Sequence, residues 1–154
     1  MTHHLVLDTN IVLDMLVFRD PRTHALHAAV FDHPVKSDLL WLATAPMREE
    51  LARVLAYPHI VVRLTFHGLH AAQVLSQFDD RARIVPVAPK APVTCKDPDD
   101  QKFIDLAVSH GATLLSKDKA VLCMRKRLVR LGVEYVGVVW PQGPVASPQP
   151  SPIL

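Results

Sequence analysis

Residues 5–14 read LVLDTNIVLD, an apolar run that stops at an acid and resumes as a second apolar segment. Residues 5–7 predict a buried strand that ends at Asp8, because every position before the acid is apolar. Residues 10–17, NIVLDMLV, predict a helix that begins almost directly after this strand. A strand followed at once by a helix is the unit from which α/β proteins with parallel sheets are built.

The same alternation of strands and helices continues along the chain. Further strands are predicted at residues 38–44, 83–87, 112–116 and 134–140, and further helices at residues 24–31, 46–55, 66–78, 99–110 and 121–131. Gly111 and Gly132 are expected to end the last two helices. The near-continuous apolar strands predict an α/β fold, with a parallel sheet of about five strands covered by helices on both faces. In such a sheet, ligands bind beyond the carboxyl ends of the strands.

Composition predicts one domain followed by a tail. An apolar content of 49% in 154 residues is sufficient for a single core, which we place in residues 1–140. Residues 141–154, PQGPVASPQPSPIL, are rich in proline and uncharged, so an extended or disordered tail is expected there. The sequence has no membrane-spanning run, no secretory signal and too few cysteines for a disulfide framework. We therefore expect a cytoplasmic protein.

Two acids lie at the carboxyl ends of predicted strands. Asp8 follows residues 5–7 directly, and one residue separates Asp118 from residues 112–116. Both acids also have a purely structural explanation, because either can cap a following helix. The rival caps and ion-pair partners in these two places are Thr9, Asn10, Lys117 and Lys119.

Helical phase separates two neighbouring acids in residues 46–55. The apolar set of this segment is Met47, Leu51, Val54 and Leu55. At about 100° per residue, Glu49 points away from that set and Glu50 lies at its edge. We therefore interpret Glu49 as a solvated acid and expect Glu50 to reach across the top of the sheet.

Phase also divides the three aspartates in residues 95–103, CKDPDDQKF. Asp97 is expected to cap a helix, with Pro98 in its first turn and Asp99 near the positive end of its dipole. The buried face is expected to contain Phe103, Ile104, Ala107 and Val108. Asp100 falls near the centre of this face, where a cap has no need of an acid. Asp100 is therefore predicted to face a further partner.

Four carboxylates, those of Asp8, Glu50, Asp100 and Asp118, are thus predicted near one edge of the sheet. Grouped anions repel one another, which raises their pKa values unless a cation lies between them. Mg²⁺ or Mn²⁺ fits such a site, because both accept carboxylate oxygens and keep waters for phosphate ligands. A site of this kind can activate water and stabilise attack on a phosphodiester.

Basic residues gather near the end of the predicted domain. They are Lys117, Lys119, Arg125, Lys126, Arg127 and Arg130. A cationic surface around an acidic metal centre suits a polyanionic substrate. A solvated helix face explains any single one of these residues equally well, and the formal net charge of +2 does not by itself require nucleic acid.

Four segments in this order resemble the PIN-domain family. They are LVLDTNIVLD at the N-terminus, EELARVL around Glu50, KDPDDQKFIDLA around Asp100 and TLLSKDKAVL around Asp118. The resemblance covers roughly residues 4–139 and is strongest to bacterial PIN proteins described as toxins of toxin–antitoxin systems. It implies a three-layer α/β/α, Rossmann-like fold and metal-dependent cleavage of RNA.

The resemblance also implies roles for individual residues. The metal ligands would be Asp8, Glu50, Asp100 and Asp118, with Asp97 as an additional candidate. Thr9, Asn10 and Ser116 would be supporting polar residues, and a threonine is commoner in the family at the position of Ser116. The RNA-contact candidates are Lys117, Lys119, Arg125 and Arg127. Family members are commonly homodimers, and the toxins are usually held by a small antitoxin protein.

Other functions remain open from the sequence. A haloacid-dehalogenase-like phosphatase needs an Asp two residues after its nucleophile, where this chain has Asn10. A receiver domain needs an acid at the end of the third strand, and RIVPVAP ends without one. In a non-catalytic module, the acids would be caps and the basic helix would bind RNA or protein. A zinc site would use the pairs His24/His27 and His67/His70, which lack a third ligand at motif spacing.

Overall fold

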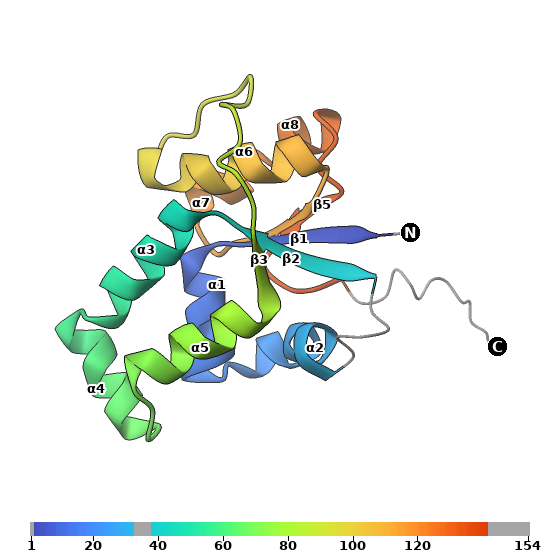
Figure 1. The fold of residues 1–154 in the computed structure, drawn as a ribbon. Helices are drawn as coiled ribbons and strands as arrows, with labels where there is room; N and C mark the ends of the chain where they lie inside the picture. The colour runs from blue at the N-terminus through green and yellow to red at the C-terminus, as the bar shows by residue number, and fades with distance from the viewer. Residues whose placement is uncertain (1, 33–37, 142–154) are drawn as a thin grey trace.

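The computed structural model describes residues 2–32 and 38–141. The predicted α/β fold is confirmed, because five strands form one parallel sheet in the order β3-β2-β1-β4-β5 (Figure 1). The strands are β1 (His3–Leu7), β2 (Leu39–Ala43), β3 (Ala82–Ile84), β4 (Thr113–Leu115) and β5 (Tyr135–Gly137). Residues 142–154 of the predicted tail lie outside the described residues, so the tail and the domain end at residue 140 stay predictions.

Helices cover both faces of the sheet. The helices α6, α7 and α8 lie on one face, and α1, α2 and α5 lie on the other (Figure 1). The α-helices are α1 (Thr9–Leu13), α2 (His24–His27), α3 (Ala45–Leu55), α4 (Pro58–Phe66), α5 (Ala71–Arg81), α6 (Gln101–His110), α7 (Lys119–Leu122) and α8 (Arg125–Arg130). Short 3-10 or π turns are η1 (Asp14–Phe18), η2 (Pro21–Thr23), η3 (Ala28–Asp32) and η4 (Pro98–Asp100). No helix in the described part of the chain is long and apolar enough to cross a membrane.

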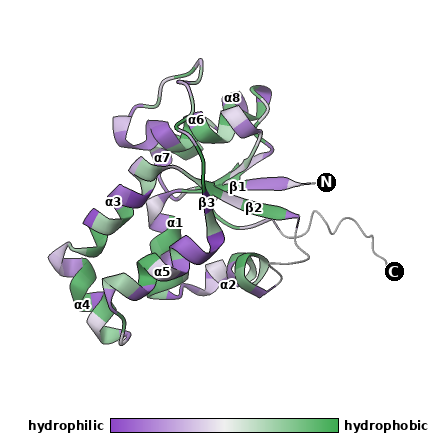
Figure 2. Ribbon diagram, viewed as in Figure 1, coloured by the Kyte–Doolittle hydropathy of each residue, from purple (hydrophilic) through white to green (hydrophobic). Residues whose placement is uncertain are grey.

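The core lies between the central strands and these helices. Leu5 and Val6 of β1 are fully buried, and Phe103 and Ile104 of α6 are buried on the same sheet. On the other face, the Trp41 ring of β2 meets a phenylalanine of α5 edge-on, with ring centroids 5.1 Å apart. Hydrophilic and hydrophobic residues alternate along α3, α5 and α6 (Figure 2), as expected of helices with one face against a sheet.

Several element boundaries differ from the prediction. The helix predicted at residues 66–78 begins only at Ala71, because the chain turns at Gly68, where φ is +68°. Glycine adopts this left-handed conformation without steric cost. The helix predicted at residues 121–131 is divided into α7 and α8. The strand predicted at residues 83–87 ends at Ile84, two residues before a proline that cannot donate to the ladder.

One helix, α4, was not predicted. Tyr57 is its N-cap residue and Pro58 occupies its first turn, where the missing N–H is not needed. Only Ile60 and Leu64 of α4 are buried. Two buried positions one turn apart are too short a stripe to distinguish a helix from a loop, which explains the omission.

Candidate metal centre

The two central strands bring two segments of the site together. The strands β1 and β4 are parallel neighbours, although more than 100 residues separate them, so Asp8 and Ser116 leave the same edge of the sheet. The Asp8 backbone N–H donates to the Leu115 carbonyl oxygen at 3.0 Å. This edge lies where the strand order reverses, which is the usual ligand site of an open α/β sheet.

Ser116 connects the two strand ends chemically. Its hydroxyl donates to Asp8 Oδ2 at 2.6 Å and accepts from the Asp118 backbone N–H at 3.0 Å. Ser116 is fully buried, so both hydrogen bonds are shielded from water. The residue therefore fixes the orientation of the Asp8 carboxylate and the start of the segment that carries Asp118.

Capping does not explain Asp8. This residue precedes α1 in the N-cap position, but its carboxylate makes no capping hydrogen bond to that helix. It is buried, and burial raises its pKa, with the negative charges of Glu50 and Asp118 acting in the same direction. The hydrogen bond from Ser116 opposes this rise. Burial of the Asp8 carboxylate costs desolvation energy, and a capping hydrogen bond does not offset that cost. Another role for this carboxylate is therefore needed.

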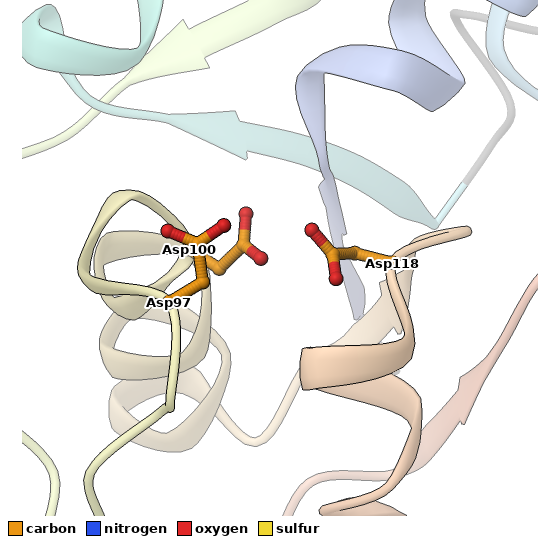
Figure 3. Close-up of side chains that lie close together, drawn as sticks. All are labelled: Asp97, Asp100 and Asp118. Atoms are coloured by element: carbon orange, nitrogen blue, oxygen red, sulfur yellow. The ribbon is translucent and has the colours of Figure 1, made fainter.

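Three carboxylates meet beside Asp8. Asp97 is the N-cap residue of η4, and Asp100 is the last residue of this turn, which leads into α6; Asp118 is the N-cap residue of α7. One ligand oxygen from each carboxylate lies within 4.8 Å of the others, and Figure 3 shows the three side chains directed toward the same space. Among the described residues this is the one group of three His, Cys, Asp or Glu side chains with this spacing, and neither histidine pair belongs to it.

Two members of this group are also helix caps. The Asp97 carboxylate accepts from the Asp99 N–H at 2.9 Å, and the Asp118 carboxylate accepts from the Ala120 N–H at 2.8 Å. The predicted cap at Asp97 is confirmed, but capping alone does not describe this residue, because it also belongs to the carboxylate group. A carboxylate has two oxygens, so one can cap a helix while the other faces a ligand.

Asp100 is buried, as its helical phase predicted, and Asp99 is exposed. The Asp100 Oδ2 atom is buried, and no described residue hydrogen-bonds to it. Burial, a hydrogen bond with the Asp118 carboxyl and the negative charge of Asp8 together raise the pKa of Asp100 to about 8. The same hydrogen bond lowers the pKa of Asp118. The two carboxyls are therefore coupled, and Asp100 is the one whose pKa is raised.

These properties fit a hard divalent cation. The donor set is entirely oxygen, which favours Mg²⁺ or Mn²⁺ over softer metals. A cation would supply the partner that Asp100 Oδ2 lacks and would replace the proton that holds Asp100 neutral near pH 7.

Glu50 reaches the site from α3. Its Oε2 atom accepts from the Thr9 hydroxyl at 2.9 Å, and its Oε1 atom lies 2.5 Å from Lys102 Nζ. Glu49 is exposed, as predicted. Glu50 is not a member of the group of three carboxylates, and Asn10 is exposed beside Thr9. Lys102 was missed in the sequence, although a lysine in the first turn of a helix, where the helix dipole disfavours positive charge, is a recognisable signal.

A second residue missed in the sequence is Asp14, in the first turn of η1. This carboxylate is buried, and its Oδ2 atom lies 2.7 Å from Lys117 Nζ. The visible signal was an acid inside the apolar residues 11–17. Lys117 is therefore engaged by a protein carboxylate, and the RNA contact expected of it stays a prediction. Three further RNA-contact candidates, Lys119, Arg125 and Arg127, are exposed.

Comparison with known proteins identifies the family. A family model described as the PIN domain matches residues 4–120, which include all five acids at the sheet edge. No curated protein matches the chain. PIN domains are generally metal-dependent nucleases, in agreement with the oxygen-rich centre between β1, β4 and α6. The match covers most of the chain, and this protein belongs to the PIN-domain family.

Proposed function

We propose that this protein is an Mg²⁺- or Mn²⁺-dependent endoribonuclease that hydrolyses RNA phosphodiester bonds. One observation carries the proposal: ligand oxygens of Asp97, Asp100 and Asp118 converge within 4.8 Å, and Asp100 Oδ2 is buried without a hydrogen-bond partner among the described residues. Family membership supports the nuclease chemistry. The choice of RNA rests on the resemblance to bacterial PIN toxins.

The residues have separate tasks in this proposal. Asp8, Asp100 and Asp118 would hold the ion, and Asp97 would add a further carboxylate. Glu50 would add a carboxylate from α3. A bound divalent cation activates water for attack on phosphorus and neutralises charge on the phosphate. Ser116 keeps the Asp8 carboxylate in place, and the hydrogen bond from the Ala120 N–H orients the Asp118 carboxylate.

The RNA backbone is expected to cross the exposed basic residues beside the centre. Lys119 is the first residue of α7 and directly follows Asp118, and Arg125 and Arg127 lie in the next helix, α8; all three are exposed. Contacts of this type bind phosphates without reading base sequence. We further propose that the protein is a cytoplasmic toxin that forms homodimers and is held by a cognate antitoxin protein.

The test is RNA cleavage by the pure protein in Mg²⁺, Mn²⁺ or EDTA. The Asp8→Asn variant is expected to cleave RNA at least about 100-fold more slowly, because removal of a ligand weakens binding of the ion. Without the ion, the remaining carboxylates repel one another. The matched control is Asp99→Asn, which removes the exposed acid beside Asp100 and is expected to keep the wild-type rate.

Two results would contradict the proposal. Full metal-dependent activity in Asp8→Asn would remove that residue from the centre. Absence of divalent-metal binding in calorimetry, together with absence of cleavage, would instead favour a non-catalytic RNA- or protein-binding module of the same fold.

A further inference from the structure

Lys102 occupies an electrostatically unfavourable place in the chain. It lies in the first turn of α6, directly after η4. The N-terminus of a helix carries partial positive charge, so a lysine there is disfavoured by the helix dipole. Its position therefore needs compensation from acceptors outside the helix.

The ammonium group of Lys102 has two such acceptors among the described residues. Its Nζ atom lies 2.5 Å from Glu50 Oε1 and donates to the Asp99 carbonyl oxygen at 2.6 Å. It also lies over the ring of Phe103, 5.0 Å from the centroid. An ammonium has three N–H donors. With two of them directed at these oxygens, one remains for a ligand.

The pair is placed where a ligand can reach it. The Lys102 side chain is 26% exposed and that of Glu50 is 20% exposed, whereas Asp100, two residues from Lys102, is buried. The pair is therefore more accessible to solvent than Asp100, and Glu50 also accepts a hydrogen bond from Thr9, the residue that follows Asp8. A phosphate drawn to a cation at Asp100 would meet acids on most sides, and Lys102 is a positive charge held beside them.

We propose that Lys102 is an RNA-binding residue that donates a hydrogen bond to a non-bridging phosphate oxygen next to the metal centre, with Glu50 holding its ammonium in place. This inference rests on the proposed function and assigns a residue that binds its substrate. Lysine is well suited to the task, because it contacts phosphate as a point charge and does not need a fixed approach angle. A half-exposed ion pair that served only the fold would contribute little to stability.

The experiment compares Lys102→Gln, Lys102→Arg and the control Arg83→Gln. Arg83 is exposed on the edge strand β3, and its replacement removes the same unit of charge away from β1 and β4. Binding of a fluorescent single-stranded RNA is measured by anisotropy in EDTA over a range of salt concentrations. Kinetics are measured in Mn²⁺, and thermal unfolding checks the fold of each variant.

Lys102→Gln is expected to raise the dissociation constant and KM about tenfold, with a smaller change in kcat. The slope of log K against log salt should fall in magnitude by about 0.7, the value for one phosphate contact on single-stranded nucleic acid. Lys102→Arg should recover most of the affinity, and Arg83→Gln should change it less than about twofold.

Equal RNA affinity, KM and salt slope in Lys102→Gln and Arg83→Gln would overturn the assignment, even if the protein is a nuclease. Absence of RNA binding by the wild-type protein would overturn it as well. If the wild-type protein binds RNA through Lys102 but does not cleave it, the proposed function fails and the Lys102 assignment stands. If Lys102→Gln unfolds, Lys102→Arg is compared with the wild type instead. A folded Lys102→Arg that has lost RNA affinity and salt slope would contradict a contact made by charge alone.

Discussion

Asp14 and Asp100 are equally buried carboxylates with opposite surroundings. Asp14 is 4% exposed and Asp100 is 6% exposed. Asp14 has the ammonium of Lys117 at 2.7 Å, whereas Asp100 faces the carboxylates of Asp97 and Asp118. Burial of a charge is costly in both places, but only one of the two charges is neutralised by the protein itself.

This difference separates an acid that is paired within the protein from one that is not. The chain completes the pair at Asp14, so that carboxylate can hold η1 against the segment between β4 and α7. At Asp100 the neighbouring side chains add further negative charge, and Oδ2 has no hydrogen-bond partner among the described residues. A proton or a cation would neutralise this carboxylate. Substitutions that remove the charge should therefore act in opposite directions at the two positions.

The largest effect is expected from Asp100→Asn. Metal-dependent cleavage should fall by about 1,000-fold or more, since about 4 kcal/mol of transition-state stabilisation corresponds to that factor. The metal-free protein should nevertheless become more stable at pH 8, by about 1–3 kcal/mol, because a buried ionisable group without a partner has been removed. Urea unfolding in EDTA measures the second effect.

The dependence of stability on pH should show the effect of Asp100 directly. The pKa of Asp100 is raised to about 8 in the folded protein, so its contribution to stability is full below the ordinary carboxyl range and is lost as the pH rises toward 8. Wild-type protein in EDTA should lose stability between pH 5 and pH 8, and Asp100→Asn should lose less. Mn²⁺ should restore stability to the wild type alone. Identical dependence of stability on pH in the wild type and in Asp100→Asn would contradict this prediction.

The next effect is expected at the complete pair. Lys117→Met should lower the free energy of unfolding by about 2 kcal/mol, since it leaves a buried carboxylate without its cation. Asp14→Asn should cost less, about 1 kcal/mol, because the half-exposed Lys117 can turn toward water. Denaturant unfolding of both variants and of the double variant measures the coupling. If Asp14→Asn stabilised the protein, Asp14 and Asp100 would respond alike to loss of charge, and the distinction between them would be wrong.

The same contrast shows what sequence patterns can and cannot predict. The inward position of Asp100 follows from helical phase within a few residues, and the strand before Asp8 follows from an unbroken apolar run. The pairing of Asp14 with Lys117 joins positions that are distant in the sequence, and it exists only because β1 and β4 are neighbours. No local pattern contains that information.

Local explanations also conceal function when they are sufficient by themselves. In the sequence, a helix cap is a sufficient explanation of Asp97, so its place among the three carboxylates could not be inferred from the turn alone. The reverse holds for Asp8, where a cap was equally reasonable and the carboxylate instead binds Ser116. Long-range contacts decide both cases. Lys102 differs, because its conflict with the helix dipole was readable from the sequence.

The smallest effect on cleavage is expected at Ser116, which precedes Lys117 in the chain and donates a hydrogen bond to Asp8. Ser116→Ala should lower the free energy of unfolding by about 1–2 kcal/mol, because it leaves Asp8 Oδ2 and the Asp118 N–H without this partner. It should also raise the pKa of Asp8 further, since the serine hydrogen bond lowers it. The pH–rate profile of cleavage should then shift to higher pH.

Ser116→Thr keeps the hydroxyl and is the matched control. Its pH–rate profile should coincide with that of the wild type, even if the extra methyl group reduces stability in this fully buried place. A shift shared by the alanine and threonine variants would trace the effect to packing and not to the hydrogen bond. In that case the Ser116 hydroxyl would not stabilise the Asp8 carboxylate. Asp8 would then be more like Asp100, which needs a proton or a cation, than like Asp14, which is paired with Lys117.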